Sequence, residues 1–432
     1  MKIIYSILVL QVISLSMVLC SCSKNAEPDK ADVGTPNILL IIADDLGKDA
    51  LYGYTEGSVK AKTPHLDELM NSGLTFQNFW ANPTCSPTRA TIITGKYGYR
   101  TGVKNAGDVL GSSEVSLQKY IGDNTNHKYA TAIIGKWHLS GTNTSINPES
   151  FGIDYYAGLI RGALTDYSQW PLTEDGVSKT QTEYATKVIT DLAINWVNAQ
   201  SKPWFLWLAY NAPHTPFHAP PVEMHQQGNL PAYTTGMEPM PYYIASIEAM
   251  DYQIGRLLDN IPENEKNNTI IIFIGDNGTT NQVAQLPYIG SKVKGTLYQG
   301  GINTPMFVSG TGVTRLGKDD NLLSGTDLFA TISELTGVNG NEFNDSKSFK
   351  SLLSQPGVIR KFQYSEINDG TTDAWAISNG TYKLIVFATG NKEMFQLKTD
   401  PYETKNLLNN NLTTAESAAK TELETELDSI RK

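Results

Sequence analysis

Four apolar runs, each followed at once by polar residues, constrain the fold of this chain more than any other feature. They cover residues 38–43, 130–134, 204–209 and 269–275. β-Branched and aromatic residues dominate them, which is typical of strands buried on both faces of a parallel sheet. Helical patterns at residues 185–197 and 243–258 lie between these runs. The alternation predicts an α/β fold with a large, mixed, mostly parallel sheet sandwiched by helices.

The polar residues after these runs are predicted to meet. In such sheets the carboxyl ends of parallel strands share one edge, and ligands bind beyond it. Each run therefore contributes candidates to a single site. The residues concerned are Asp44 and Asp45, Lys136 and His138, His214, and Asp276 and Asn277.

The pattern changes at about residue 339. Short candidate strands follow at residues 361–365, 374–378, 382–387 and 393–397, separated by turn residues. Close spacing of this kind predicts an antiparallel meander. Residues 413–431 are rich in Ala, Glu, Leu and Lys and predict a terminal helix. We therefore expect a catalytic domain over residues 36–338 and a C-terminal subdomain over residues 339–432.

The first 22 residues indicate an export signal. Met1-Lys2 precedes an apolar run over residues 3–19 that is too short for a membrane span. Leu19-Cys20-Ser21-Cys22 resembles a bacterial lipobox, which makes Cys22 the lipidated first residue of the mature protein; a plain secretory signal is the alternative. A polar linker over residues 23–35 would act as a tether. We expect a periplasmic or surface protein with a lipid anchor in the membrane.

Charge and cysteine content narrow the function further. The net charge of the 432 residues is −10, from 44 acidic and 34 basic residues, and the sequence has no long basic run. We therefore do not expect nucleic acid as a partner. Cys85 is the only cysteine outside the first two dozen residues. If Cys20 leaves with the signal, the mature chain keeps only Cys22 and Cys85. An unpaired cysteine in an exported protein calls for a functional explanation.

The segment around Cys85 carries the most specific motif. Pro87 and the Ala-Thr-Ile-Ile run after it predict a helix that begins there, with Cys85 at its positive end and Arg89 one turn further on. A lone cysteine can also be a buried structural thiol. Cys85-Ser86-Pro87-Thr88-Arg89, followed by Thr-Gly-Lys, resembles the signature of the type I sulfatases, which belong to the alkaline phosphatase-like superfamily.

The resemblance runs from about residue 36 to the C-terminus. Asp400-Pro401-Tyr402-Glu403 is similar to the stretch that precedes the last helix in that family, whose members carry a smaller C-terminal sheet with a helix. In the family a maturation enzyme converts the cysteine to formylglycine, whose hydrated aldehyde attacks the sulfur of a sulfate ester. The resemblance implies this modification at Cys85, with Arg89 steadying the hydrate.

The acidic residues are candidates for a metal site. Oxygen ligands from two strand ends suit Ca²⁺ or Mg²⁺ rather than a soft metal, although such residues also end strands and cap helices. The resemblance implies one divalent cation, calcium rather than magnesium, with the modified Cys85 aimed at the same ion. The implied ligands are Asp44, Asp45, Asp276 and Asn277.

The basic residues have implied catalytic roles. A lone lysine or histidine is more often solvated or packed, but Lys136, His138, His214 and Lys294 each match a family position. If the chain is extended there, Lys136 and His138 share one side. The resemblance implies that Lys136 and Lys294, with Arg89, stabilise charge on the sulfuryl oxygens. His214 would protonate the leaving alcohol, and His138 would help to expel sulfate.

Several other residues are less clear from the sequence. Gln299 and Asn303 stand where the family often has glutamate and arginine, which keeps hydrogen-bonding capacity and loses an ion pair. His218, His225 and the loop-like Trp170 are candidates for a substrate pocket or for packing. His65 and His127 have no supporting context, and Asp327 is predicted to start a helix.

The sequence thus favours a calcium-dependent sulfatase that acts on sulfated glycans or their fragments. A phosphate or phosphonate ester hydrolase of the same superfamily is the first alternative. A surface-anchored, non-catalytic glycan-binding protein is the second. The identity of the sugar, the position of its sulfate and the oligomeric state have no signature in the sequence.

Overall fold

The computed structural model describes residues 35–142 and 146–432. Residues 35–432 form one compact unit. The predicted signal peptide, the lipobox with Cys22 and the linker up to residue 34 lie outside the described residues. None of the helices in the described part of the chain combines the length and the apolar composition that crossing a membrane requires.

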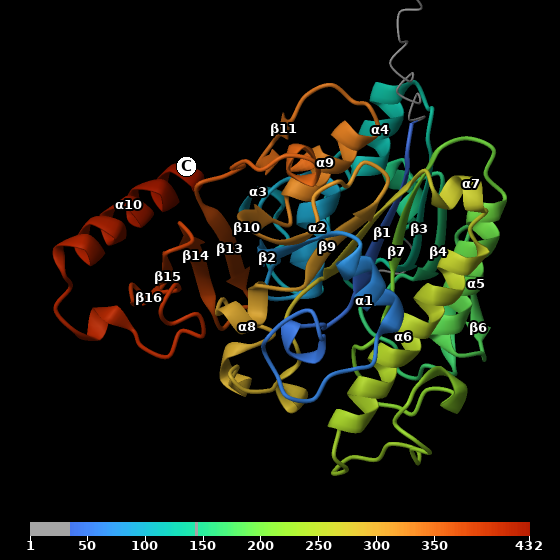
Figure 1. Ribbon diagram of the computed structural model, residues 1–432, viewed down its shortest axis with the longest axis horizontal. Coiled ribbons are helices and arrows are strands. Elements are labelled where there is room, and N and C mark those ends of the chain that lie inside the picture. Colours follow the sequence, from blue (N-terminus) through green and yellow to red (C-terminus); the bar gives the residue numbers. More distant parts are fainter. Residues whose placement is uncertain (1–34, 143–145) are drawn as a thin grey trace, which may run out of the picture. The chain divides into compact units, whose positions relative to one another are not determined.

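A ten-stranded mixed sheet forms the centre of the fold (Figure 1). Most of its strands point the same way; β9 and β5 run against their neighbours. In spatial order the strands are β10 (Gly317–Ser324), β2 (Leu74–Trp80), β9 (Met306–Gly310), β8 (Thr269–Gly275), β1 (Asn37–Ala43), β7 (Trp204–Ala209), β3 (Ala130–Lys136), β4 (Tyr155–Leu159), β5 (Trp170–Glu174) and β6 (Val177–Gln181).

The four predicted apolar runs are the adjacent parallel strands β8, β1, β7 and β3. Every residue of these four strands is buried, as expected for strands covered on both faces. The register pairs Ala43 with Gly275, and Ala209 with both Ile42 and Gly135. The carboxyl ends of the strands are therefore level, and the residues that follow them meet at one edge.

Helices cover both faces of this sheet. Successive strand residues point to opposite faces, so Leu39 and Ile41 join one core and Ile38 and Leu40 the other. The first core includes α1 (Pro64–Asn71), α5 (Ala185–Asn198) and α6 (Met240–Asn260); the second includes α2 (Cys85–Thr94), α4 (Leu117–Thr125) and α9 (Asp327–Leu335). Three short helices are α3 (Gly98–Thr101), α7 (Glu263–Lys266) and α8 (Gln299–Ile302). Asp327 begins α9, as predicted.

The C-terminal part contains the predicted antiparallel meander. Its strands are β13 (Gln363–Asn368), β14 (Asp373–Ser378), β15 (Tyr382–Phe387) and β16 (Lys392–Gln396). β13 begins two residues later than predicted and ends three residues later. One face of this sheet packs on Trp80, Leu297 and Ile302, and α10 (Thr414–Ile430) covers the other with Leu423 and Leu427. A two-residue pair, β11 (Glu342–Phe343) and β12 (Ser346–Lys347), precedes it.

Candidate active site

A cavity of about 370 Å³ lies where the central strands end. Cys85, His138, His214 and Lys294 all line it. These residues come from α2 and from the segments after β3, β7 and β8, so the sheet topology brings them together. The volume lies in the range of small-ligand sites.

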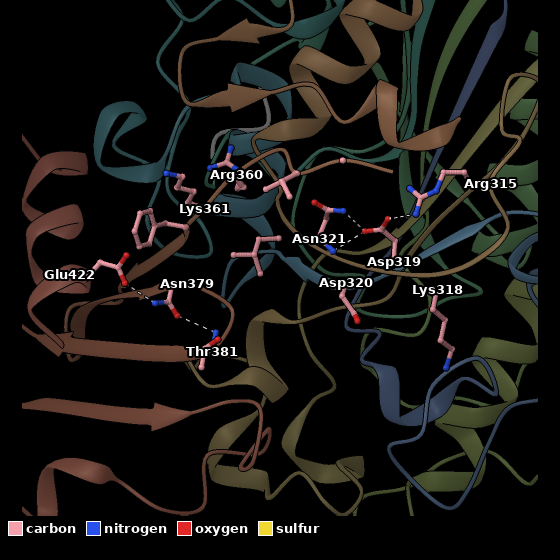
Figure 2. A pocket seen from close by; sticks show the side chains of 14 residues that line it. Arg315, Lys318, Asp319, Asp320, Asn321, Arg360, Lys361, Asn379, Thr381 and Glu422 are labelled. Atoms are coloured by element: carbon pink, nitrogen blue, oxygen red, sulfur yellow. Dashed lines mark hydrogen bonds and ion pairs between the residues drawn. The ribbon is translucent and has the colours of Figure 1, made fainter. Parts of the chain in front are cut away.

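Cavity size alone does not locate this site. A larger polar groove of about 640 Å³ lies between β10, the turn after β14 and α10 (Figure 2). Its arginines are already paired, Arg315 with Asp319 at 2.8 Å and Arg360 with Asp327. The groove holds no cysteine or histidine. The side chains suited to chemistry gather instead at the cavity beside Cys85.

Cys85 is the first residue of α2, and Pro87 is the third residue of that helix. Thr84 is the extended residue before the helix, so the thiol lies at the helix N-terminus, as predicted. Its residue surface is only 2% exposed. Burial raises the pKa of the Cys85 thiol, although the charge of Lys136 opposes this shift. An unmodified thiol here is therefore neutral and a poor nucleophile.

Three buried carboxylates each contact one cation beside Cys85. Lys136 Nζ lies 2.5 Å from Asp44 Oδ2, and Lys294 Nζ lies 2.6 Å from Asp45 Oδ2. Arg89 Nη2 donates to Asp276 Oδ2 at 2.8 Å. Three negative and three positive side chains thus balance, so a bound divalent cation would leave this site with net positive charge, which suits an anionic substrate.

Further hydrogen bonds hold the cluster rigid. Arg89 Nη1 donates to the Lys136 carbonyl at 2.8 Å and so ties α2 to the end of β3. Asn277 Nδ2 donates to Asp45 Oδ1 at 2.8 Å, and the Asp45 amide donates to Asp276 Oδ1 at 3.2 Å. These bonds connect the segments after β1 and β8.

The same cluster fits a divalent cation. Asp44 Oδ1 and Asn277 Oδ1 are buried and have no hydrogen-bond partner among the described residues. Asp44, Cys85 and Asp276 offer ligand atoms within 4.8 Å of one another, as do Asp44, Asp45 and His214. Hard oxygen donors of this kind suit calcium or magnesium.

Two of the carboxylates have opposite pKa shifts. Burial favours the neutral form of Asp45, but His214 and Lys294 outweigh it and lower the pKa to about 2. Burial, reinforced by the charge of Asp44, raises the pKa of Asp276 to about 6. The difference arises because burial and the charge of Asp44 together outweigh the opposing charges of Arg89 and Lys136 at Asp276.

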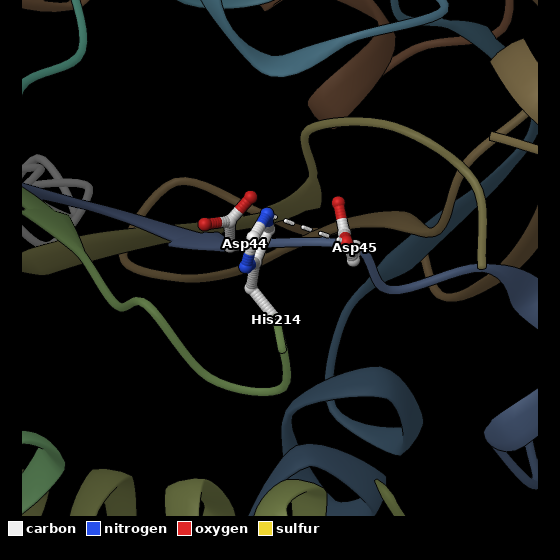
Figure 3. A group of neighbouring side chains, drawn as sticks. All are labelled: Asp44, Asp45 and His214. Atoms are coloured by element: carbon white, nitrogen blue, oxygen red, sulfur yellow. Dashed lines mark ion pairs between the residues drawn. The ribbon is translucent and has the colours of Figure 1, made fainter. Parts of the chain in front are cut away.

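Two histidines face the cavity from different loops. His214 reaches over the end of β1 toward Asp45, with Nε2 at 3.7 Å from Asp45 Oδ2 (Figure 3). Its Nδ1 lies 2.6 Å from the Thr215 carbonyl, a contact that needs a proton on Nδ1 and leaves Nε2 to face the site. Burial, helped by Lys136, lowers the pKa of His138 to about 2, so that imidazole is neutral.

The remaining sequence candidates lie elsewhere. His218 stacks on Tyr167 with ring centroids 3.8 Å apart, and burial lowers its pKa to about 4. His225 and His65 line a separate small cavity, and His127 follows α4. The interpretation of Trp170 as a loop residue is wrong, because it starts β5 and is buried.

Gln299 and Asn303 support the site indirectly. Asn303 Oδ1 accepts a hydrogen bond from Lys48 Nζ at 2.7 Å, and Lys48 Nζ also donates to the Gln77 carbonyl at 2.6 Å. The backbone N–H of Gln299 donates to Glu403 Oε2 at 2.5 Å, whereas the buried side-chain Nε2 of Gln299 has no partner among the described residues. Asn303 therefore uses its hydrogen-bonding capacity to hold a buried lysine.

Four residues beside the site were missed from the sequence. Arg161 lines the cavity, and the Tyr243 hydroxyl donates to the Asp45 carbonyl at 2.9 Å. Ser86 Oγ donates to the His138 carbonyl at 2.8 Å. Asn211 is buried with both side-chain polar atoms unpartnered among the described residues. Two members of this group have a sequence signal, since Asn211 comes just after an apolar run and Ser86 lies in the motif at Cys85.

Family models match most of this chain. The model "Sulfatase" matches residues 36–338, and the model "N-sulphoglucosamine sulphohydrolase, C-terminal" matches residues 291–432. The uncharacterized sulfatase YdeN of Escherichia coli K12 is 30% identical over 354 residues, which cover 69% of this chain and 62% of YdeN. Human N-acetylgalactosamine-6-sulfatase is 28% identical over 343 residues, covering 70% and 62%. The chain thus spans less than two thirds of the length of these two relatives.

Solved structures match over nearly the whole described chain. Ps i-CgsB has a TM-score of 0.78 and 25% identity, covering 92% of this chain and 93% of that one. It has also been solved in complex with k-i-k-neocarrahexaose. BT4656, in complex with its substrate D-glucosamine-2-N,6-O-disulfate, has a TM-score of 0.73 and 21% identity, covering 91% and 97%. These proteins share the two-sheet architecture described above.

Proposed function

Because this chain belongs to the sulfatase family, we propose that it hydrolyses sulfate esters at the cavity beside Cys85. One observation carries the proposal. A buried thiol at a helix N-terminus lines the same cavity as Lys294, His138 and His214, next to a carboxylate oxygen of Asp44 and an amide oxygen of Asn277 that have no partner among the described residues. The site thus offers places for a nucleophile, a cation and an anionic substrate together.

Conversion of Cys85 to formylglycine is part of the proposal. The modification would supply a hydrated aldehyde as nucleophile, which the neutral thiol does not provide. Arg89 lies one turn further along α2, fully buried between Asp276 and the Lys136 carbonyl. It would hold position 85 and the strand ends in a fixed relation. A formylglycine-generating enzyme is therefore a required partner.

Four side chains have proposed roles in charge and proton transfer. Lys136 and Lys294 would stabilise the sulfuryl oxygens, since both ammonium groups lie in the cluster. His214, with its Nε2 directed into the site, would give a proton to the leaving alcohol. The lowered pKa keeps the His138 imidazole neutral, which is the form that the proposed role in expelling sulfate requires.

A divalent cation would be held by Asp44, Asp45, Asp276 and Asn277, beside position 85. We propose calcium rather than magnesium, because four side chains from the protein would supply ligands, whereas magnesium usually keeps several of its waters. Bound there, the ion would neutralise charge on the sulfate. It would also satisfy the unpartnered oxygens of Asp44 and Asn277.

The proposed substrates are sulfated glycans or their fragments. BT4656, which shares this fold, acts on a disulfated glucosamine. An export signal with a lipid on Cys22, as the sequence predicts, would bring the protein to such material outside the cytoplasm. Periplasmic or surface location and the lipid anchor belong to this proposal.

Mass spectrometry of the tryptic peptide over residues 63–89 tests the nucleophile. The protein should be made in a host that matures such cysteines, with Cys85→Ala as the control. We expect a mass lower than that of the thiol peptide by the exchange of SH and H for an aldehyde oxygen. An intact thiol in protein from that host would contradict the proposed nucleophile.

Release of sulfate from aryl and sugar sulfates tests the activity. The same assay with matched aryl phosphates separates sulfate from phosphate specificity. We expect faster turnover of the sulfates and loss of that turnover by at least about a thousandfold in Cys85→Ala. Faster phosphate turnover would favour the ester hydrolase alternative, and glycan binding without turnover by the fully converted protein would favour a binding protein.

A further inference from the structure

The cavity beside Cys85 is lined by basic and small residues only. None of the eleven residues that line it is Asp or Glu. Its basic members are His138, Arg161, His214 and Lys294. This composition is unusual in a chain of net charge −10, and it indicates a ligand with more than one negative group.

Among the lysine and arginine side chains that line the cavity, Arg161 is the one without an ion-pair partner among the described residues. Lys294 is bound to Asp45 at 2.6 Å, and His214 Nδ1 contacts the Thr215 carbonyl. Arg161 is exposed, and no carboxylate of the described residues lies within ion-pair distance of it. Its guanidinium is thus free to bind a group that the substrate brings.

The backbone around Arg161 is held in place. Strand β4 ends at Leu159, whose carbonyl accepts from the Trp137 amide at 2.9 Å, and the Ile160 carbonyl accepts from the His138 amide at 3.1 Å. On the other side Leu164 is buried in the core. Gly162 lies against the His138 imidazole, so closely that a Cβ would come within 2.0 Å of Nε2. The backbone of Arg161 is therefore held in one position beside the cluster around Cys85.

We infer that Arg161 forms a subsite for a second anionic group of the substrate, a sulfate or a carboxylate on the same or the adjoining sugar. This inference rests on the function proposed above. A guanidinium binds sulfate and carboxylate alike through paired N–H donors. Gly162 and Ala163 follow Arg161 in the cavity lining, and they leave room and provide no aromatic ring for stacking a sugar. Charge is therefore the main feature that this side of the cavity can recognise.

The experiment compares sugars that differ in one anionic group. A monosulfated sugar is matched with the same sugar carrying a second sulfate, and with one joined to a uronate. We expect the wild-type protein to prefer at least one of the doubly charged sugars in kcat/KM by about tenfold or more. Which of the two is preferred distinguishes a sulfate from a carboxylate as the second group.

Variants of Arg161 test whether this residue causes the preference for a doubly charged sugar. In Arg161→Gln we expect the preference to fall to near unity, while kcat/KM for the monosulfated sugar changes less than about twofold. Arg161→Lys should keep part of the preference, because it keeps the charge and loses the paired donors. Lys318→Gln, in the groove of Figure 2, is the matched control and should change neither value. Equal losses on both sugars in Arg161→Gln, or an unchanged preference, would overturn the inference.

A binding measurement tests the Arg161 subsite independently of the proposed sulfatase activity. Calorimetry with Cys85→Ala and the disulfated sugar needs no turnover. We expect Arg161→Gln, added to Cys85→Ala, to weaken binding by about tenfold, and less so at high salt. Unchanged affinity would refute the subsite even if sulfate release is observed, and a loss of affinity would support it even if no sulfate is released.

Discussion

The residue with the most constrained geometry in the site is His138. Its φ of 59° lies in the left-handed region, which non-glycine residues rarely adopt. The chain is not extended at His138, because β3 ends at Lys136 and the backbone turns there, yet both side chains reach the cluster beside Cys85. The hydrogen bond from the His138 amide to the Ile160 carbonyl compensates for this turn. No sequence pattern around Trp137 signals such a turn.

Gly162 gives a test of how strictly the His138 imidazole must be placed. In Gly162→Ala the new Cβ would lie 2.0 Å from His138 Nε2, so the ring must move. We expect kcat on a simple aryl sulfate to fall at least about tenfold, since small misplacements of catalytic groups cost this much or more. The assay is steady-state kinetics with a thermal melt of each variant.

Gly111→Ala is the matched control for that prediction. Its Cβ would meet only Ser113 Oγ at 4.0 Å, which is ordinary contact. We expect wild-type kinetics from it. Unchanged kcat in Gly162→Ala would mean that the ring position, and hence His138, matters little to the reaction.

At the scale of elements, a buried carboxylate joins α6 to the start of α1. Asp251 of α6 accepts hydrogen bonds from the amides of His65 and Leu66 in the first turn of α1. Burial raises the pKa of Asp251 to about 7, although these amides lower it. Its ordinary value in an unfolded chain is about 3.9. The native state therefore binds a proton that the unfolded state releases between these two values.

The raised pKa of Asp251 makes the folded protein less stable as pH rises. A raised native pKa gives stability that is present at low pH and is lost as pH rises through about 7. From pH 5 to pH 8 we expect this group to remove roughly 3 kcal/mol from the free energy of unfolding. In Asp251→Asn, the free energy of unfolding measured with urea should change less between pH 5 and pH 8, by that amount. Asp259 is exposed on the same helix, and Asp259→Asn should leave the pH dependence unchanged. An identical pH dependence in wild type and Asp251→Asn would contradict the raised pKa.

The ends of β1 and β8 are expected to depend on a bound cation. Asp44 and Asp45 follow β1, Asp276 and Asn277 follow β8, and two of their oxygens lack partners among the described residues. Calcium at a hundred times its Kd should stabilise the folded protein by about 3 kcal/mol. We expect Tm to fall by several degrees after exhaustive chelation and to recover with added calcium.

A double variant serves as the control for the cation. Asp44→Asn with Asp276→Asn removes two ligand charges and should abolish the response of Tm to calcium. A wild-type Tm that is the same with chelator and with calcium would argue against a metal at this edge.

The sequence predicted the central strands of the large sheet well and its outer strands poorly. Residues 204–209 and 269–275 match β7 and β8 fully, because long β-branched runs buried on both faces have few other structures open to them. The polar β10, by contrast, was not predicted as a strand at all. Its place in the sheet depends on pairing with β2 across more than two hundred residues, which no local pattern encodes.

At the scale of the whole molecule, the C-terminal sheet holds the segment that carries Lys294. Lys383 of β15 donates to the Leu297 carbonyl at 2.5 Å and forms a buried ion pair with Glu403 at 2.6 Å. Glu403 in turn accepts from the Gln299 amide at 2.5 Å, and its carbonyl accepts from Lys292 Nζ at 2.5 Å. These contacts lie on both sides of Lys294 in the chain.

Breaking this pair should loosen the segment over residues 292–299. Glu403→Ala leaves the Lys383 charge buried without a partner, which should cost about 3–5 kcal/mol of stability. Adding Lys383→Met removes that charge and should recover most of the loss. We expect faster hydrogen exchange at residues 292–299 in both variants, and reduced turnover even in the stable double variant, because the contacts that hold Lys294 are gone.

An exposed ion pair on the same sheet is the comparison. Lys392 and Glu424 lie 2.6 Å apart with partly exposed side chains. Glu424→Gln should change stability by no more than about 0.5 kcal/mol and exchange at residues 292–299 not at all. Exchange in that segment that is the same in Glu403→Ala and wild type would show that the C-terminal sheet does not hold it.

The sequence predicted the members of this arrangement without predicting their contacts. Asp400-Pro401-Tyr402-Glu403 was recognised as a family stretch, and the strand of Lys383 was placed correctly over residues 382–387. A sequence pattern shows that Lys383 lies on a strand, yet not that its ammonium reaches Leu297. The same limit applies to Arg161, whose position beside Cys85 depends on the end of β4 and not on its neighbours in the chain.

The burial of Cys85 also determines when the chain can acquire its proposed nucleophile. The cavity admits a group the size of a sulfate, but residue 85 lies within a helix and is 2% exposed, with Ser86, Thr88 and Arg89 fully enclosed. An enzyme that converts Cys85, as proposed, would have to reach a side chain that the folded protein encloses. Under the proposed function, we expect conversion to precede folding, and a chain that folds first would keep the unmodified thiol. The proportion of active protein in a cell would then depend on the relative rates of modification and folding, and not on an equilibrium between two forms.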